Sequence, residues 1–131
     1  MLKGLLHWDQ ETKMPSKAID HRGRQVSLLA RMAHEEATST QVGELIAECE
    51  SDSDLTGDPT SDTATNLVRL RRDYDRATKL PKALVEEIAR VTTVGQQVWT
   101  EARAKKDFAR FEPTLAEVVR LKKEEASALS T

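Results

Sequence analysis

The stretch PKALVEEIARVTTVGQQVWTEARAKK, residues 81–106, carries a helical pattern that organises the whole chain. Pro81 is expected to be the first residue of this helix, because its missing N–H needs no partner there. The apolar and small residues then recur at alternating intervals of four and three, at Leu84, Ile88, Val91, Gly95, Val98 and Ala102. This spacing places them on one face as a packing seam. We therefore expect residues 81–106 to be the spine of an antiparallel helical bundle.

Helical spacing is also present on the N-terminal side of the spine. Ser16 is expected to cap a helix over about residues 16–37, and Gly23 inside it predicts a close helix crossing, because glycine otherwise costs about 1 kcal/mol relative to alanine. The apolar positions of this helix are Val26, Leu29, Ala30 and Ala33. A short helix over residues 41–50 places Val42, Leu45, Ile46 and Cys49 on one face. Cys49 is thus interpreted as a small core residue.

Two further helices complete the expected bundle. The first runs from Thr63 to Leu80, with a stripe formed by Leu67, Leu70, Tyr74 and Ala77. After the spine, DFARFEP breaks the pattern and Pro113 is expected to start the last helix, which bears Leu115, Val118, Val119 and Leu121. With the end of another helix before Pro15, the pattern predicts one all-α domain over residues 1–131, a bundle of about five to six helices.

Residues 51–62, SDSDLTGDPTSD, are expected to form an acidic surface loop, exposed or disordered. Its D-x-D start has the beginning of a calcium loop. Leu55 and Thr56 follow Asp54, however, without the glycine and terminal glutamate that an EF-hand requires. The segment is therefore not interpreted as a calcium site.

Composition excludes several classes of protein. The 20 basic and 22 acidic residues give a net charge of −2, which disfavours nucleic acid and anionic membrane as partners. The run RLRRDYDR, residues 69–76, is interrupted by Asp73 and Asp75 and is interpreted as a solvated helix face. One cysteine, no long apolar run and no secretion signal favour a cytoplasmic protein.

No catalytic or metal-binding residue is predicted. His34-Glu35-Glu36-Ala37-Thr38 resembles the zinc motif H-E-x-x-H, but Thr38 stands where the second histidine ligand must be. Cys49 lies on an apolar face, and no G-x-S-x-G elbow or phosphate-binding glycine loop occurs. We therefore expect no zinc and no other cofactor in this chain alone.

The segment LLHWDQETKMP, residues 5–15, concentrates a tryptophan and two acids in a chain with few aromatics. Trp8 is able to bury a large apolar area, while Asp9 and Glu11 are able to cap a helix or pair with basic residues. A structural plug is the favoured interpretation; lining the mouth of a peptide groove is the alternative. The segment of interest comprises Trp8, Asp9, Gln10, Glu11, Thr12, Met14 and Pro15.

Three separated stretches resemble one known family, the Taq-type (thermostable carboxypeptidase 1) zinc metallocarboxypeptidases. They are the Trp8–Pro15 segment, Leu80-Pro81 followed by Glu86 and Glu87, and Trp99–Arg103 leading into Asp107-Phe108 and Phe111–Pro113. The resemblance implies a mostly helical fold and removal of C-terminal residues from peptides. It also implies zinc held by an H-E-x-x-H helix and a downstream glutamate, neither of which this sequence contains.

The resemblance suggests an N-terminal fragment without the zinc site, inactive alone, with peptide as substrate only in a complete enzyme. A stand-alone helical interaction or regulatory module is the alternative, and the nucleotide sequence on both sides of the coding region would distinguish the two. The family commonly forms homodimers. Because a subdomain exposes apolar surface, a homo-oligomer, most simply a dimer, is expected through Leu5, Leu6, Trp8 and Trp99.

Overall fold

The computed structural model describes residues 2–130, and every regular element in that range is helical. This confirms the all-α prediction, with five substantial helices after Pro15. The elements are α1 (Leu2–Thr12), the 3₁₀ turn η1 (Ser16–Ala18), α2 (Ile19–Ala37), α3 (Thr40–Ser51), α4 (Ser53–Thr56), α5 (Asp62–Thr78), α6 (Lys82–Lys105) and α7 (Phe108–Ser130). None of them is long and apolar enough to cross a bilayer.

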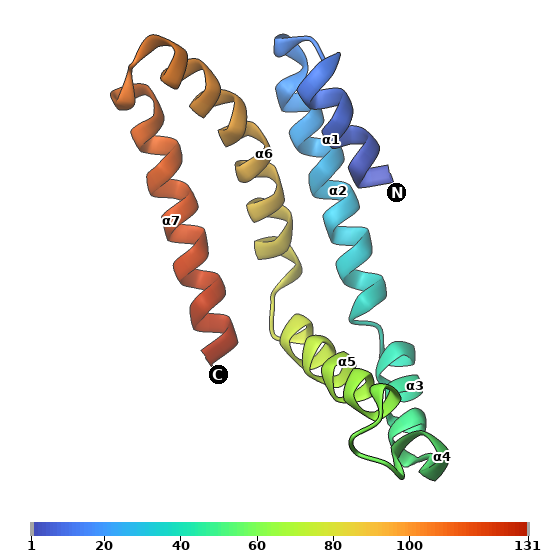
Figure 1. Cartoon of the computed structure of the whole chain (residues 1–131). Helices are drawn as coiled ribbons and strands as arrows, with labels where there is room; N and C mark the ends of the chain where they lie inside the picture. The colour runs from blue at the N-terminus through green and yellow to red at the C-terminus, as the bar shows by residue number, and fades with distance from the viewer. Residues whose placement is uncertain (1, 131) are drawn as a thin grey trace.

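The helices form two regions (Figure 1). In the first region, which we call the layer, α6 lies between α2 and α7 and runs antiparallel to both, while α1 packs on α2. In the second, which we call the tip, α3, α4 and α5 extend beyond the end of α2 and return the chain to α6. The expected spine is therefore confirmed as the central helix of the layer. Pro81 is not its first residue, however, because its backbone is extended and α6 begins at Lys82.

The core of the layer follows the predicted seam of α6. Leu84, Val91 and Leu121 of α7 are buried together, with Ile88 and Val118 packed against them. Leu121 is only 1% exposed, so this contact between α6 and α7 excludes water. Burial of this apolar seam is the main force that holds α7 on the spine.

Two glycines let α6 approach its neighbours closely. A Cβ atom on Gly23 would lie 3.0 Å from Cγ2 of Val94, which confirms the predicted close crossing of α2 and α6. A Cβ atom on Gly95 would lie 2.9 Å from Cγ2 of Thr114 on α7. The adjacent positions 94 and 95 thus contact helices on two sides of the spine.

The turn between α6 and α7 corrects the expectation that Pro113 starts the last helix. Lys106 adopts a left-handed conformation with φ 54°, which ends α6, and Asp107 accepts a hydrogen bond from the backbone N–H of Arg110 at 3.1 Å. This cap starts α7 at Phe108, so Pro113 lies inside the helix. Pro113 therefore leaves one backbone hydrogen bond of α7 unmade, because it has no N–H to donate.

The start of α2 is also different from the expectation. Ser16 belongs to η1, and no side chain caps either η1 or α2. Pro15 instead fixes an extended backbone that turns the chain after α1. Further along α2, Ala33 is exposed and falls outside the buried face that Val26, Leu29 and Ala30 share.

The tip is held together by fewer buried side chains. Ile46, Ala64 and Leu67 are buried between α3 and α5, and Cys49 is half-buried. The predicted stripe of α5 fails at Leu70, which is 56% exposed; Arg71 takes its place on the inner face and pairs with Glu50. The long side chain of Arg71 packs its apolar stem along the inner face of α5 while its charged end reaches Glu50 on α3.

Residues 51–62 are more structured than the expected loop. Ser51 ends α3, Ser53–Thr56 form the one-turn helix α4, and Asp62 begins α5. Asp52 caps α4 by accepting a hydrogen bond from the N–H of Asp54 at 2.8 Å. The acids and glycine of the segment thus cap a short helix. The sequence did not predict that helix, because one turn has no repeated apolar spacing.

Candidate functional site

The Trp8–Pro15 segment forms the end of α1 and the turn into η1. Thr12 donates its hydroxyl to the carbonyl of Trp8 at 2.6 Å, and the N–H groups of Lys13 and Met14 both donate to the carbonyl of Asp9. These bonds satisfy carbonyls at the C-terminus of the helix. The segment therefore ends α1 in a defined turn.

An ion pair between a buried arginine and a partly exposed aspartate joins this turn to α2. Arg22, whose side chain is 8% exposed, donates from Nη2 to Oδ2 of Asp9 at 2.5 Å. It also donates from Nη1 to the carbonyl of Leu6 and from Nε to Gln25 at 3.1 Å. A guanidinium removed from water is tolerated only when its donors are satisfied in this way. Of the two roles expected for Asp9, capping a helix or pairing with a basic residue, the structure shows the pairing.

Sequence reasoning missed Arg22. The available signal was its position, because Arg22, Val26 and Leu29 share one helical face. A cation at the end of an otherwise apolar stripe indicates a partner carboxylate elsewhere in the chain. The two acids in residues 8–15 were the candidates for that partner.

Amide side chains attach the same segment to α6. Gln10 donates to the carbonyl of Thr93 and to Oε1 of Gln96, both at 3.4 Å, and Gln96 donates to Glu11. Gln97 donates to the carbonyl of Ser16 at 3.1 Å. These glutamines were also not predicted, since polar residues beside an apolar seam are usually exposed.

A polar cavity of about 320 Å³ lies at this junction, between the turn and α6. Its two carboxylates come from Glu11 and Glu101. Hydrogen bonding from Gln97 and the charge of Arg110 lower the pKa of Glu101, which is therefore ionised at neutral pH. Both carboxylates already have amide or guanidinium partners, so the arrangement stabilises the junction and offers no free general base.

Trp8 itself is 55% exposed in this chain. It lies on the same face of α1 as Leu5, which is also exposed. The Trp8–Pro15 segment is therefore held in place by its polar residues Asp9, Gln10 and Glu11, while the indole of Trp8 faces outward. Met14 is half-buried in the junction, and Pro15 makes the turn.

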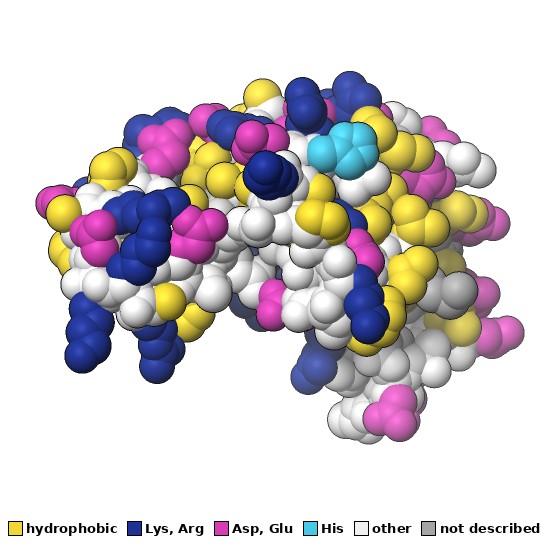
Figure 2. Space-filling view, turned by 90° about the horizontal axis from the view of Figure 1, so that it is seen from above, with side chains coloured by type: hydrophobic (Ala, Val, Ile, Leu, Met, Phe, Trp, Pro, Cys, Tyr) yellow, Lys and Arg dark blue, Asp and Glu magenta, His cyan; other side chains and the backbone are white. Residues whose placement is uncertain are grey.

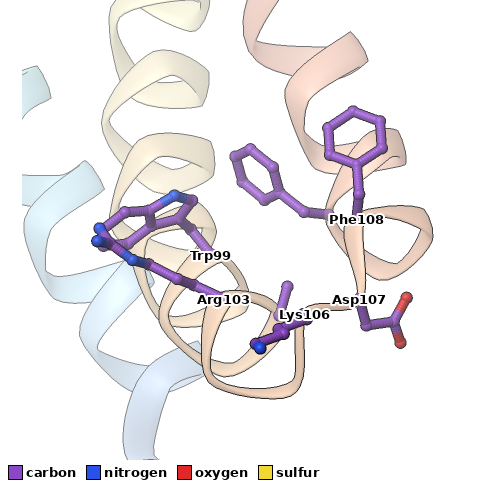
Figure 3. Close-up of a pocket in the computed structure, with 7 residues that line it drawn as sticks. Trp99, Arg103, Lys106, Asp107 and Phe108 are labelled. Atoms are coloured by element: carbon purple, nitrogen blue, oxygen red, sulfur yellow. The ribbon is translucent and has the colours of Figure 1, made fainter.

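A second, apolar cavity of about 480 Å³ lies where α6 turns into α7 (Figure 3). Trp99, Phe108 and Phe111 form its apolar walls, and Arg103 lies over the indole of Trp99 with its Cζ 5.1 Å from the ring. Asp107 points away from the cavity, as expected for the residue that caps α7. The cavity is wide open, and no serine, threonine, cysteine or histidine lines it.

The H-E-x-x-H-like stretch is used for structure. Nε2 of His34 lies 3.0 Å from the carbonyl oxygen of Leu80, and Glu35 pairs with Lys82 at 3.1 Å. Thr38 donates its hydroxyl back to the carbonyl of His34 at 2.7 Å. Within residues 2–130, no group of three or more His, Cys, Asp or Glu side chains could hold a metal ion.

The fold and the junction define an all-α substructure in which the polar groups of the Trp8–Pro15 segment hold α1, α2 and α6 together. A family model described as "Carboxypeptidase Taq (M32) metallopeptidase" matches residues 1–131, and the chain belongs to this family. The suspected resemblance is therefore confirmed.

Two curated relatives are named thermostable carboxypeptidase 1. The relative from Thermus thermophilus is 39% identical over 98% of this chain, and that from Pyrococcus furiosus is 28% identical over 97%. In both cases the chain spans only 25% of the relative's length.

Solved structures agree with the fold. The crystal structure of BsuCP matches 95% of this chain with a TM-score of 0.84 at 25% identity, over 24% of its own length. The structure of CHT matches 96% of this chain with a TM-score of 0.61 at 37% identity, over 25% of its own length. The helical arrangement thus occurs as part of larger proteins.

Proposed function

We propose that this chain is the N-terminal helical part of a metallocarboxypeptidase that removes residues from the C-termini of peptides. The observation that carries the proposal is the family match along all 131 residues, combined with relatives named carboxypeptidases of which the chain spans a quarter. In this proposal the chain supplies framework, and the catalytic residues belong to the remaining part of the enzyme.

The residues described here do not fit the zinc site that the resemblance implies. His34 contacts a backbone carbonyl, Glu35 is paired with Lys82, and Thr38 replaces the second histidine. His34 and Glu35 already join α2 to the start of α6, and Thr38 bonds back to the backbone of α2. No step of peptide hydrolysis is therefore assigned to this chain.

Its proposed contribution is mechanical. The Arg22–Asp9 pair and the glutamines of α6 fix α1 and its turn against the layer. A peptide-binding surface needs such rigid support, because small displacements of catalytic geometry reduce rates strongly. Asp9 and Arg22 are accordingly positioning residues in this proposal.

Two experiments test the proposal. The purified chain is expected to bind no stoichiometric zinc and to trim no C-terminal residue from a peptide; zinc binding with turnover would contradict it. A chimera in which residues 1–131 replace the matching quarter of the Thermus carboxypeptidase is expected to be active. A folded but inactive chimera would argue against the framework role.

A variant pair sharpens the chimera experiment. Asp9→Ala leaves the buried Arg22 guanidinium without its carboxylate and is expected to lower activity at least tenfold. Asp54→Ala, on the exposed α4, is the matched control and should leave activity unchanged. Equal losses in the two variants would remove the special role of the pair.

We also propose that the chain self-associates through its exposed apolar residues. Leu5 and Trp8 on α1 and Trp99 on α6 are exposed, and monomers rarely leave such surfaces open when they are contiguous. Figure 2 shows hydrophobic side chains at the surface among charges of both signs. Light scattering at micromolar concentration should give a mass above 14.7 kDa; a mass that stays at 14.7 kDa contradicts this proposal.

A further inference from the structure

The outer face of α5 carries a continuous row of positive charge. Arg69, Arg72, Arg76 and Lys79 follow one another at intervals of three, four and three residues, which places them on one side of the helix. All four side chains are exposed, whereas the buried residues Ala64 and Leu67 lie on the opposite side. We call these four residues the basic stripe.

One of the two acids that interrupt the basic stripe in the sequence, Asp75, pairs with an arginine outside it. Arg71, which lies outside the stripe, pairs with Glu50 at 2.7 Å and with Asp75 at 3.8 Å. Asp75 is therefore directed toward Arg71 on the flank of the helix. Within residues 2–130, no member of the stripe forms an ion pair.

This arrangement is unlike the other charged faces of the molecule. Arg120 on α7 contacts Glu87, Glu117 and Glu124, so its charge is compensated within the chain. Like charges spaced three and four residues apart destabilise an isolated helix. The stripe therefore leaves four exposed cations without an ion pair within residues 2–130, and an anionic partner would complement them.

We propose that the basic stripe binds an acidic helix of a partner protein. The eleven residues from Arg69 to Lys79 extend about 15 Å along the axis at a rise of about 1.5 Å per residue. Carboxylates at every third or fourth position of a second helix have the same spacing. Arginine guanidinium groups bind carboxylates through two parallel hydrogen bonds. These bonds fix the orientation of the two side chains in addition to the charge attraction between them.

An apolar neighbour favours a protein over a nucleic acid. Val68 is 70% exposed and lies beside Arg72 on the flank of the stripe. An amphipathic helix has apolar side chains that can cover Val68, whereas a phosphate backbone has none. The low net charge of −2 also provides no long-range attraction for a polyanion.

The test uses a fluorescein-labelled helical peptide with glutamate at every third or fourth position and leucine on the adjacent face. Its binding to the full chain is followed by fluorescence anisotropy at about 20 mM salt, where screening is weak. The variant R69A/R72A/R76A is expected to weaken binding about tenfold, because each exposed pair contributes modestly. Alanine favours helix, so α5 should remain intact by circular dichroism.

The matched control is K13A/K17A/K105A, which removes the same charge from exposed positions outside the stripe. It should leave the affinity within about twofold, since exposed charges beyond a Debye length are largely screened. Equal loss in both triple variants would overturn the proposal. Stronger binding of a single-stranded RNA of equal charge would also overturn it.

Single charge reversals provide a second measurement if the triple variant loses helix. Arg72→Glu, at the centre of the stripe, should weaken peptide binding several-fold more than Lys17→Glu. Val68→Ala should weaken it without changing the salt dependence, because it removes only apolar contact. Identical affinities for Arg72→Glu and Lys17→Glu would contradict the proposal. None of these measurements depends on peptidase activity.

Discussion

The layer and the tip both consist of antiparallel helices, but different interactions hold them together. In the layer, Leu84, Val91 and Leu121 exclude water, and glycines bring the helix backbones close. In the tip, Ile46, Ala64 and Leu67 are buried, and they share the interface with the Arg71–Glu50 ion pair. The hydroxyl of Tyr74 also donates to the carbonyl of Ser39 at 3.3 Å. Apolar burial therefore dominates the stability of the layer, and polar contacts weigh more in the tip.

A charge placed in the layer should have the largest effect. Ile88→Asp would put an unpaired carboxylate against the Leu84 and Val91 cluster, at a cost of several kcal/mol. We expect loss of cooperative thermal unfolding measured by circular dichroism. Val68→Asp, on the exposed face of the tip, is the control and should unfold like the parent chain.

Unchanged melting of Ile88→Asp would show that the seam is not a water-free contact. An equal effect of Val68→Asp would remove the distinction between the two regions.

The same substitution, leucine to alanine, made once in each region compares how much each core contributes to the free energy of unfolding. Leu121→Ala should lower the free energy of unfolding by about 3 kcal/mol, because its side chain is fully enclosed between α6 and α7. Leu67→Ala in the tip should cost less, about 2 kcal/mol, since its surroundings have room to collapse. Urea titration followed by circular dichroism measures both; a larger loss at Leu67 would reverse the ranking.

The smallest expected effect concerns acid. The hydrogen bond from Arg71 lowers the pKa of Glu50 below its ordinary value of 4.5. A depressed carboxylate pKa adds stability above the unfolded-state value, and this contribution is lost as the pH falls through the folded-state value. Glu50→Gln should therefore melt below the parent chain at pH 7, and the two melting curves should converge as the pH falls through the lowered pKa of Glu50.

Glu44→Gln is the control for this pH experiment, because Glu44 is exposed and forms no ion pair within residues 2–130. A constant difference between Glu50→Gln and the parent chain at all pH values would mean that the Arg71 pair does not cause the effect.

The sequence predicted the layer better than the tip for the same physical reason. A repeated apolar spacing, as from Leu84 to Ala102, reports directly on burial, and Gly23 reported on a close crossing. The exposure of Leu70 and the inward position of Arg71 depend on which neighbour α5 meets, here Glu50 on α3. That partner is distant in sequence, so local spacing carries no information about it.

The same limit applies to the candidate site and to the helix ends. Asp9 was expected to pair with a cation, but only the fold identifies Arg22 as that cation. Pro113 was placed at a helix start because proline is common there, whereas the Asp107 cap starts α7 earlier. A side-chain cap can start a helix before the residue whose preference predicts the start. Whether it does so depends on the local backbone geometry, which composition does not give.

The two connections of the spine have different consequences for the order of folding. Only Lys106 and Asp107 separate α6 from α7, so this hairpin closes with little loss of chain entropy. Docking of α2 on α6 must instead close the whole segment from Thr38 to Pro81. The α6–α7 hairpin is therefore expected to form early, and a shorter tip would speed the later docking of α2.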